Sequence, residues 1–553
     1  MAHIYTSTQA FWETPELVAM CFESVDKRSL SSCARISKRL SEIALDALYR
    51  DGPGYVKILK LLCSMNENES GSLHFSVDLT PDHWDRFRRY SSRIYSLTVH
   101  HARDPFRTVL NEALVELLTT LPQGEVLLPS LTRLNWEDGK AATNPFATLL
   151  FHDKLQEVNL TVAEWDTTIL LQHLARRSPN IITLRLKTRE IEESDEFNVE
   201  EVQEITAKVV PAFSSLRSLG LPPDLASMDV IRALSQHPNL VRLWVANFAI
   251  KGTQVDESDF KGGPSESFSN LRELSLGSTN LIGLSSTFLS GTMIGIVSLH
   301  VDIIEEDHIP EFLKLVSTSY PNLRDFGMMF VYWRLLGPQS WFEKPLTMGV
   351  LKPLLSMRRL ESLVLEHPMP PDISDEELGE FSLCFPELKH LELCVQARGS
   401  FEGVVPTLSC LLLFAQNCRK LISIGIYMDA TISPPIIKPD QKVFAPSLRD
   451  IHAFCSKIRQ YHPVADFLAG ILPPEAKLTL IRGPARLVPV MGKMTDYFGS
   501  VGLDDRLDET SRKCRNRWQE ASRLLADLFR VRQLLASERK RNEEVWNSGG
   551  SML

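Results

Sequence analysis

Residues Phe385–Leu393 read FPELKHLEL, and this stretch contains the pattern that decides the fold. The Phe-Pro pair ends one helix and turns the chain, and leucines then follow in the spacing L-x-x-L-x-L at Leu388, Leu391 and Leu393. The same spacing, with other apolar residues allowed, recurs along most of the chain. Its other copies are Ile94, Leu97 and Val99; Leu131, Leu134 and Trp136; Leu155, Val158 and Leu160; Ile181, Leu184 and Leu186; Leu216, Leu219 and Leu221; Leu240, Leu243 and Val245; Leu271, Leu274 and Leu276; Ile296, Leu299 and Val301; Leu323, Phe326 and Met328; Leu360, Leu363 and Leu365; Leu421, Ile424 and Ile426; and Leu448, Ile451 and Ala453, with a degenerate copy near Leu478 and Leu480.

Each copy is preceded by a similar turn and separated from the next by an amphipathic stretch. The turns read SPNI, HPNL, YPNL, APSL and LPSL, with FSSL and FSNL as variants. The copies are about 24 to 37 residues apart, and apolar residues between them recur at helical spacing. These apolar residues include Ile169, Leu170, Leu174 and Ala175; Ile231 and Leu234; and Phe312, Leu313 and Val316. Each unit therefore reads as strand, turn and helix, and a stack of units can bury the apolar face that one unit cannot.

The pattern resembles the leucine-rich-repeat family, in its irregular form with long helices. The resemblance predicts an α/β solenoid with parallel strands on the concave face and helices on the convex face. A doubly wound α/β domain is the alternative, since it also alternates strands and helices. Its strands are usually longer continuous apolar runs, and it does not require the leucine spacing a dozen times.

Strand geometry predicts which side chains face the concave surface. In each copy the leucines point inward and the residues between them point outward. These outward residues include Arg133, Asn135, Glu157, Asn159, Glu366, His390 and His452. We expect a protein substrate to bind among Arg185, Lys187, Arg242, Trp244, Glu273, His300, Glu392 and Tyr427, with Trp244 exposed. Ordinary solvated strand residues are the alternative for each position taken singly.

A short helical block precedes the repeats. Thr14 can cap a helix that begins at Pro15, and Leu17, Val18, Cys21, Phe22 and Val25 then form an apolar stripe. Asp26 can cap a second helix through Leu30, Cys33 and Ile36, and a third contains Leu40, Ile43, Ala44, Ala47 and Leu48. Three helices in about forty residues are too few to build a good core alone. We therefore expect the block to lean on a partner or on the rest of the chain.

The block resembles an F-box, without gaps over about 38 residues. The matching positions are Thr14-Pro15-Glu16-Leu17-Val18, Cys21-Phe22-x-x-Val25, Ser29-Leu30, Ile36-Ser37-Lys38-Arg39-Leu40 and Leu48-Tyr49. Thr14, Cys21 and Leu40 depart from the family's Leu, Ile and aromatic residue. An F-box followed by leucine-rich repeats is a known family arrangement, and its diverged forms look like those abundant in fungi.

The resemblance implies a substrate adaptor of an SCF-type cullin ubiquitin ligase, which performs no chemistry itself. Its F-box would dock on the linker subunit, and through it on the cullin, while the repeats hold an unknown protein substrate. The docking residues implied are Pro15, Leu17, Val18, Phe22, Leu30 and Ile36, for which packing between the helices is the alternative role. The second hypothesis is a non-catalytic scaffold whose F-box-like block no longer engages a ligase.

Composition changes mark further boundaries. We expect an F-box-like domain over 1–51, a helical linker or cap over 52–90, the repeat solenoid over 91–485 and a helical tail over 486–553. Gly52-Pro53-Gly54 marks the first break, and a helix from Val56 to Met65 is expected to follow. Residues 509–545 read as one long helix. Its apolar face could cap the solenoid or bind a partner helix, and its basic clusters could be a nuclear-localisation signal. The apolar face comprises Trp518, Ala521, Leu524, Leu525, Leu528, Val531, Leu534 and Leu535.

Composition and missing motifs exclude several classes of function. The 553 residues carry a net charge of −9, which argues against a general nucleic-acid binder. No apolar run is long enough to cross a bilayer, and Met1–Phe11 does not read as a secretory signal. The nine cysteines are scattered without C-x2-C spacing, so we expect reduced thiols and no zinc site. No nucleophile-elbow, phosphate-loop, dinucleotide-binding or metalloprotease motif is present. We therefore expect a cytoplasmic or nuclear protein with no enzymatic activity, cofactor or metal.

Overall fold

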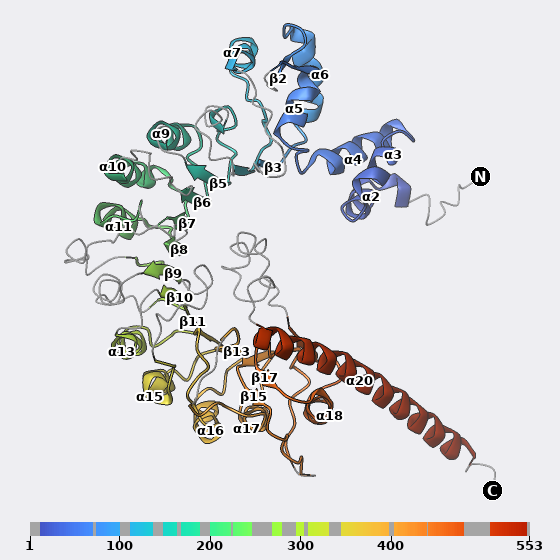
Figure 1. The fold of residues 1–553 in the computed structure, drawn as a ribbon. Coiled ribbons are helices and arrows are strands. Elements are labelled where there is room, and N and C mark those ends of the chain that lie inside the picture. The colour runs from blue at the N-terminus through green and yellow to red at the C-terminus, as the bar shows by residue number, and fades with distance from the viewer. Residues whose placement is uncertain are drawn as a thin grey trace. The chain divides into compact units, whose positions relative to one another are not determined.

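The computed structural model divides into two compact units, Met1–Val255 and Asp256–Leu553. The described residues are 11–69, 73–99, 111–136, 147–162, 167–188, 199–222, 225–245, 268–278, 295–303, 308–330, 344–397, 403–438, 441–480 and 509–549. Each unit contains parallel strands followed by helices (Figure 1).

The first unit begins with the expected three-helix block, formed by α2 (Pro15–Phe22), α3 (Lys27–Cys33) and α4 (Lys38–Tyr49). The Asp26 side chain accepts hydrogen bonds from the first-turn amides of α3, and Ser37 does the same for α4. Partly buried apolar side chains, among them Leu40 and Leu48, surround a small core. The residues of that core are Val18, Phe22, Leu30 and Ala44.

The segment after the block differs from the expected helix at its C-terminal end. Helix α5 (Tyr55–Leu62) ends before Met65, where the sequence predicted that it would finish. Met65 instead begins strand β1 (Met65–Glu67), which pairs antiparallel with β2 (Leu73–Phe75). Backbone pairing with a later segment therefore outweighs the local helical preference of this residue. Helix α6 (Pro81–Ser91) follows, with a capping box at Thr80 and His83.

Six parallel strands of the first unit stand side by side in chain order. They are β3 (Ser96–Val99), β4 (Arg133–Trp136), β5 (Glu157–Val162), β6 (Thr183–Thr188), β7 (Ser218–Leu221) and β8 (Arg242–Val245). Their inward apolar residues are aligned in register: Leu97, Leu134, Val158, Leu184, Leu219 and Leu243. The helices of these repeats lie on one side of the strands (Figure 1). They are α7 (Asn111–Thr120), α9 (Thr167–Arg177), α10 (Val199–Val209), continued by a 3-10 turn (Val210–Ala212), and α11 (Met228–Ser235).

The second unit repeats this arrangement. Its parallel strands are β9 (Glu273–Ser278), β10 (Ser298–Ile303), β11 (Asp325–Phe330), β12 (Ser362–Glu366), β13 (His390–Leu393), β14 (Ser423–Ile426), β16 (Asp450–His452) and β18 (Lys477–Thr479). Leu274, Leu299, Phe326, Leu363, Leu391, Ile424, Ile451 and Leu478 stand in register. Its repeat helices are α13 (Ile309–Ser319), α15 (Met348–Leu351) with a 3-10 turn (Lys352–Ser356), α16 (Asp375–Cys384), α17 (Cys410–Asn417) and α18 (Tyr461–Ile471). Two short strands, β15 (Asp429–Ala430) and β17 (Lys457–Ile458), pair parallel in a separate small sheet.

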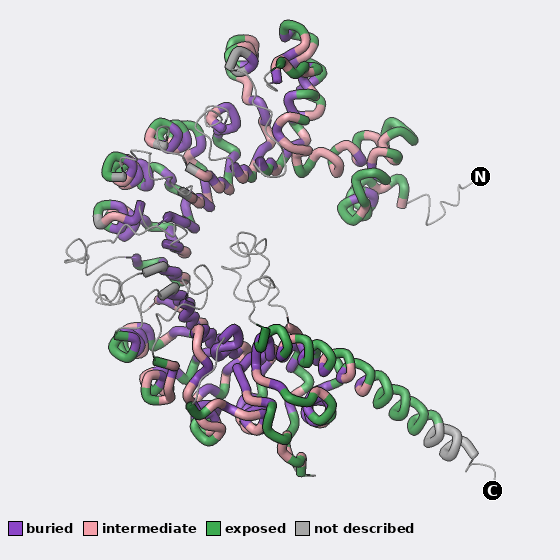
Figure 2. Tube along the Cα trace, viewed as in Figure 1, coloured by how far each residue is buried: buried purple, intermediate pink, exposed green. Residues whose placement is uncertain are grey.

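Strand order decides between the two predicted architectures. Within each unit, neighbouring strands of the parallel sheet follow one another in chain order. A doubly wound sheet reverses its strand order at a switch point. The apolar residues of the strands are buried in both units. Figure 2 marks buried residues along the strands in purple. The α/β repeat prediction is therefore confirmed.

Helix α20 (Glu509–Gly549) covers the last repeats of the second unit with its first half. Trp518 is fully buried, and its indole Nε1–H donates to the Ser456 carbonyl oxygen at 2.8 Å. Arg517 donates to the Ile458 carbonyl oxygen, and the Ser522 hydroxyl donates to that of Leu478. These bonds satisfy carbonyl groups at the end of the stack, which supports the capping interpretation for this half.

The predicted apolar stripe of α20 is divided between two environments. Of the predicted residues, Trp518, Ala521 and Leu525 are buried, Leu524 and Leu528 are half-buried, and Val531, Leu534 and Leu535 are exposed. Leu534 lies nine residues after Leu525, which at 3.6 residues per turn places it on the opposite side of the helix.

We expect Trp518→Ala to destabilise the second unit by about 3 to 5 kcal/mol, since it removes a buried ring and leaves the Ser456 carbonyl without its donor. Leu534→Ala, on the exposed part of the same helix, should stay within about 0.5 kcal/mol. Urea unfolding followed by circular dichroism compares the two. Equal effects would contradict the capping role.

Candidate functional site

The structure divides the six predicted docking residues of the N-terminal block into two groups. Val18, Phe22 and Leu30 are buried in its core. Pro15 is exposed, the exposed fraction of Leu17 is 44%, and that of Ile36 is 68%. Positions 18 and 22 are one helical turn apart and face the other two helices, so the neighbouring position 17 faces outward. Pro15, Leu17 and Ile36 are therefore available to a partner, and the buried three hold the shape of the block.

Sequence reasoning missed two further apolar side chains on this block. Met20 lies three positions after Leu17, on the same outward face of α2, and is 68% exposed. Trp12 is half exposed and packs edge-on against Phe11. The spacing of three between Leu17 and Met20 was the signal that could have identified this face.

The departures from the F-box pattern also fall in different places. Leu40 is half-buried against the core of the block. Cys21 is exposed, and Thr14 is half-buried at the N-terminus of α2. Replacement of the usual aromatic residue by Leu40 therefore affects internal packing, whereas Cys21 changes the outer surface.

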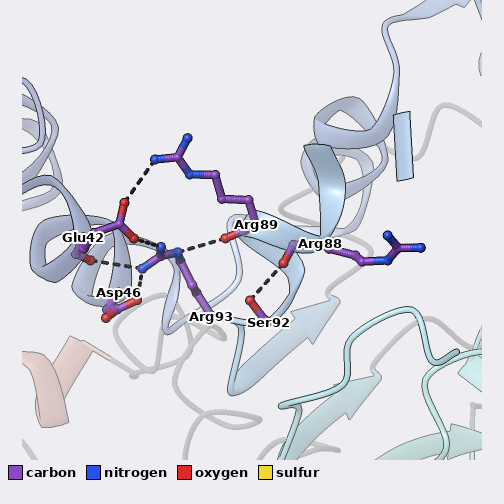
Figure 3. A network of polar contacts seen from close by, with 6 residues as sticks. All are labelled: Glu42, Asp46, Arg88, Arg89, Ser92 and Arg93. Atoms are coloured by element: carbon purple, nitrogen blue, oxygen red, sulfur yellow. Dashed lines mark hydrogen bonds and ion pairs between the residues drawn. The ribbon is translucent and has the colours of Figure 1, made fainter. Parts of the chain in front are cut away.

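Ion pairs and backbone bonds fix the block to the segment that follows it. The Arg93 guanidinium donates to the carboxylates of Glu42 and Asp46, to the Glu42 carbonyl oxygen and to that of Arg89 (Figure 3). Arg89 also donates to the Glu42 carboxylate, at 3.0 Å. Hydrogen bonds from these two arginines lower the pKa of Glu42. Arg93 is the central residue of this network of ion pairs and hydrogen bonds, because its side chain is only 13% exposed and contacts both α4 and α6.

The backbone after α4 is also bonded to the first repeat strand. The amides of Tyr95 and Ser96 both donate to the Arg50 carbonyl oxygen, and the Gly52 amide donates to that of Ser96 at 2.7 Å. The block is thus joined by hydrogen bonds to the sheet of the first unit. We expected such support because the core of the block is too small to hold it folded alone.

The predicted concave residues of the first unit meet around one tryptophan. Trp244 is buried, with 6% exposed, so the expectation that it is exposed was wrong. The guanidinium carbon of Arg185 lies 4.8 Å from the centroid of its ring, and that of Arg242 lies 5.6 Å away. Arg242 stands on the same strand as Trp244, whereas Arg185 reaches the indole from β6, across Gly220 of β7, which the sequence of one strand cannot show. Lys187 lies half-buried on the strand that carries Arg185.

In the second unit, the predicted residues are mostly enclosed. His300, Glu392 and Tyr427 are buried, and Glu273 is half-buried. The His300 ring lies against Gly327 of the next strand, where any side chain would collide with the imidazole. Burial lowers the pKa of His300 to about 4, so this ring is neutral at pH 7.

Comparisons with known proteins add the following. No family model matches the sequence, and no curated protein matches it. A similar solved structure is the complex of Rad7 and Elc1 in yeast, with 15% identity, a TM-score of 0.35, and 80% of this chain and 94% of that chain covered. A second is the leucine-rich-repeat-containing protein LegL7 from Legionella pneumophila, with 14% identity, a TM-score of 0.30, and 54% of this chain and 82% of that chain covered. A third is an internalin, InlF, from Listeria monocytogenes, with 12% identity, a TM-score of 0.28, and 66% of this chain and 87% of that chain covered.

The fold is a leucine-rich-repeat solenoid. The strand register and the burial of the strand residues in each unit establish this fold. All nine cysteines are free, and six of them are buried. Within the part of the chain that the structure describes, no group of His, Cys, Asp and Glu could hold a metal ion, and no helix is both long and apolar enough to cross a membrane.

We expect Arg93→Met to loosen the contact between α4 and α6, since it leaves the Glu42 and Asp46 carboxylates without their shared donor. Amide hydrogen exchange in these helices should quicken by about tenfold or more, which corresponds to a loss of about 1 to 3 kcal/mol. Arg89→Met, whose side chain is 59% exposed, should change exchange little. Similar exchange in the two variants would refute the central role of Arg93.

We expect His300 to reduce the stability of the second unit as the pH falls from 6.5 towards 4. In this range the unfolded state binds a proton at His300, whereas the folded state does not. Falling pH therefore stabilises the unfolded state relative to the folded state. Asp325 acts in the opposite direction, because burial and its acidic neighbours raise its pKa from 3.8 to about 6. His300→Gln should therefore retain on the order of 2 kcal/mol more of its pH 7 stability at acid pH than the wild type, and Asp325→Asn should retain less.

Urea unfolding midpoints of the wild type, His300→Gln and Asp325→Asn, each measured at pH 7 and at pH 4, test this expectation. The same pH dependence in wild type and His300→Gln would contradict it.

Proposed function

We propose that this protein is a substrate-recognition adaptor of an SCF-type cullin ubiquitin ligase, active in the cytoplasm or nucleus. The block of α2, α3 and α4 binds the linker subunit, and through it the cullin. The repeat surface binds a protein substrate. The observation that carries the proposal is that Leu17, Met20 and Ile36 stand exposed on this small block although its core is filled. Exposed apolar side chains grouped on one small folded element are typical of a protein interface.

The proposed mechanism is positional rather than chemical. An adaptor raises the effective concentration of a substrate lysine near the charged conjugating enzyme. That function requires a block that cannot swing freely relative to the repeats which hold the substrate. The Arg93 network and the bonds of the Arg50 carbonyl group meet this requirement within the first unit. The protein itself is proposed to be non-catalytic.

Co-expression with an SCF linker subunit, followed by size-exclusion chromatography, tests the adaptor proposal. The wild type should elute as a complex. Leu17→Asp with Ile36→Asp should abolish it, because both side chains are exposed and a buried carboxylate without a partner opposes binding. Phe22 is unsuitable for this purpose, since it is buried and its change would unfold the block.

The matched control is Val115→Asp with Leu118→Asp on α7, where both side chains are similarly exposed in the same unit. It should leave the complex intact. A wild-type protein that folds but forms no complex would reject the proposal, as would a control that fails equally.

A scaffold without a ligase remains the second candidate, and the exposed Cys21 favours it, since a smaller residue here reduces the outer apolar area. If the block keeps the family's binding mode, Thr14→Leu with Cys21→Ile should tighten linker binding by about fivefold, because about 1 kcal/mol of added apolar burial is gained. Titration of the purified proteins measures this change. Unaltered affinity would favour the scaffold.

A further inference from the structure

We propose that the strand face of the first unit binds an acidic segment of a partner protein, an extended peptide whose Asp or Glu carboxylates meet Arg185 and Arg242 beside Trp244. This inference rests on the proposed function, because it names the chemical class of substrate that the repeat surface would take.

One row of outward side chains defines the track for such a peptide. The row passes through five neighbouring strands in register, and its members are Asn135, Asn159, Arg185, Gly220 and Trp244. Adjacent strands are about 4.8 Å apart, so the row spans about 19 Å, which is the length of about six extended residues. Gly220 lies between Arg185 and Trp244, and its missing side chain leaves room for them to approach each other.

Two positive charges lie here, Arg185 in the row and Arg242 on the strand that carries Trp244. Arg242 donates from its Nε to the Ser218 hydroxyl at 2.6 Å, and Arg185 contacts the Asn159 side-chain oxygen only at 3.5 Å. Among the described residues, neither guanidinium forms an ion pair with a carboxylate. Burial lowers the pKa of Arg185; the Glu157 carboxylate opposes this shift, and the positive charge of Arg242 adds to it. A peptide carboxylate placed between the two arginines would add to the partial compensation that Glu157 gives.

Trp244 fixes the positions of the two guanidinium groups, and its own polar group is enclosed. Its Nε1–H is buried without an acceptor among the described residues. The indole also holds both guanidiniums by cation–π contacts, which limits the conformational freedom that binding would otherwise remove. The site is thus rich in pre-oriented donors, and guanidinium forks match the geometry of carboxylates.

The second unit carries the opposite charge at comparable outward strand positions. Its acidic side chains there are Glu273, Asp325, Glu366, Glu392 and Asp450. In the first unit, Arg133, Arg185, Lys187 and Arg242 outnumber the single acidic residue Glu157 on the corresponding strands. Charge complementarity therefore directs an acidic segment to the first unit alone.

The test uses the intact chain and a fluorescein-labelled peptide of about eight residues that alternates Glu and Ser, so that the carboxylates of an extended strand face one side. Fluorescence anisotropy should show binding to the wild type and at least about tenfold weaker binding of the Gln/Ser counterpart. Arg185→Gln with Arg242→Gln should weaken binding of the Glu peptide by about tenfold or more.

The control is Arg176→Gln with Lys208→Gln, which removes the same charge from exposed positions on the helices of this unit. It should change affinity by less than about twofold. A second variant, Arg185→Lys with Arg242→Lys, keeps the charges but removes the guanidinium forks. It should bind the Glu peptide more weakly than the wild type and more tightly than the Gln variant, so that loss of affinity through misfolding is recognised.

Equal weakening in the control would overturn the proposal, because attraction would then be non-specific. Equal affinity for the Glu and Gln peptides would also overturn it. Binding of a phosphoserine peptide without binding of the Glu peptide would reject the carboxylate assignment. Linker-subunit binding, measured on the same variants, depends on α2 to α4 and should be unaffected. Failure of the peptide site is thus distinguishable from failure of the adaptor proposal.

Discussion

The constraint on which the structure depends is that no single repeat can bury its own apolar strand residues. Leu391 is covered because Leu363 and Ile424 stand beside it in register, and the same holds along the strands of each unit. A shift by one residue would turn this whole set to the outer face, so the register is strongly fixed. Burial of each apolar strand side chain contributes roughly 1.5 to 3 kcal/mol to the free energy of folding. A repeat obtains this contribution only when the neighbouring repeats are in place.

The same constraint explains the two elements outside the repeats. An array of this kind has an exposed apolar end wherever a neighbour is missing, and capping elements must cover it. The first half of α20 does so in the second unit, where Trp518 reaches the Ser456 carbonyl oxygen. In the first unit, the N-terminal block and α6 share Arg93, and the backbone at Arg50 bonds to the first strand. Structural connection and the proposed docking role are therefore combined in one block of about forty residues.

The outer faces of the strands are free from the packing constraint, and the two units use them differently. Positions such as Arg185 and Arg242 in the first unit and Glu273 and Asp325 in the second contribute little to the core, so their charge can vary without loss of fold. Where several such residues meet, their properties become collective. Arg185 and Arg242 crowd one indole ring, and Asp325 has a raised pKa partly because Glu361 and Glu273 are near. These are effects of neighbouring strands rather than of any one repeat.

The repeat, its strand positions and the three helices of the N-terminal block could all be predicted from local sequence patterns. Leu388, Leu391 and Leu393 specify an inward face because alternation along a strand is a local property. Only the tertiary structure decided which outward residues are accessible. Trp244 and His300 were expected at the surface, yet both are buried. Arg185 lies over the indole, and the His300 ring lies against Gly327, both from strands many residues away in the sequence. Val18 and Leu17 are adjacent in sequence, and one fills the core while the other faces solvent, since helix rotation against α4 separates them. Burial at such positions is a property of neighbours brought together by folding, and the local pattern does not contain it.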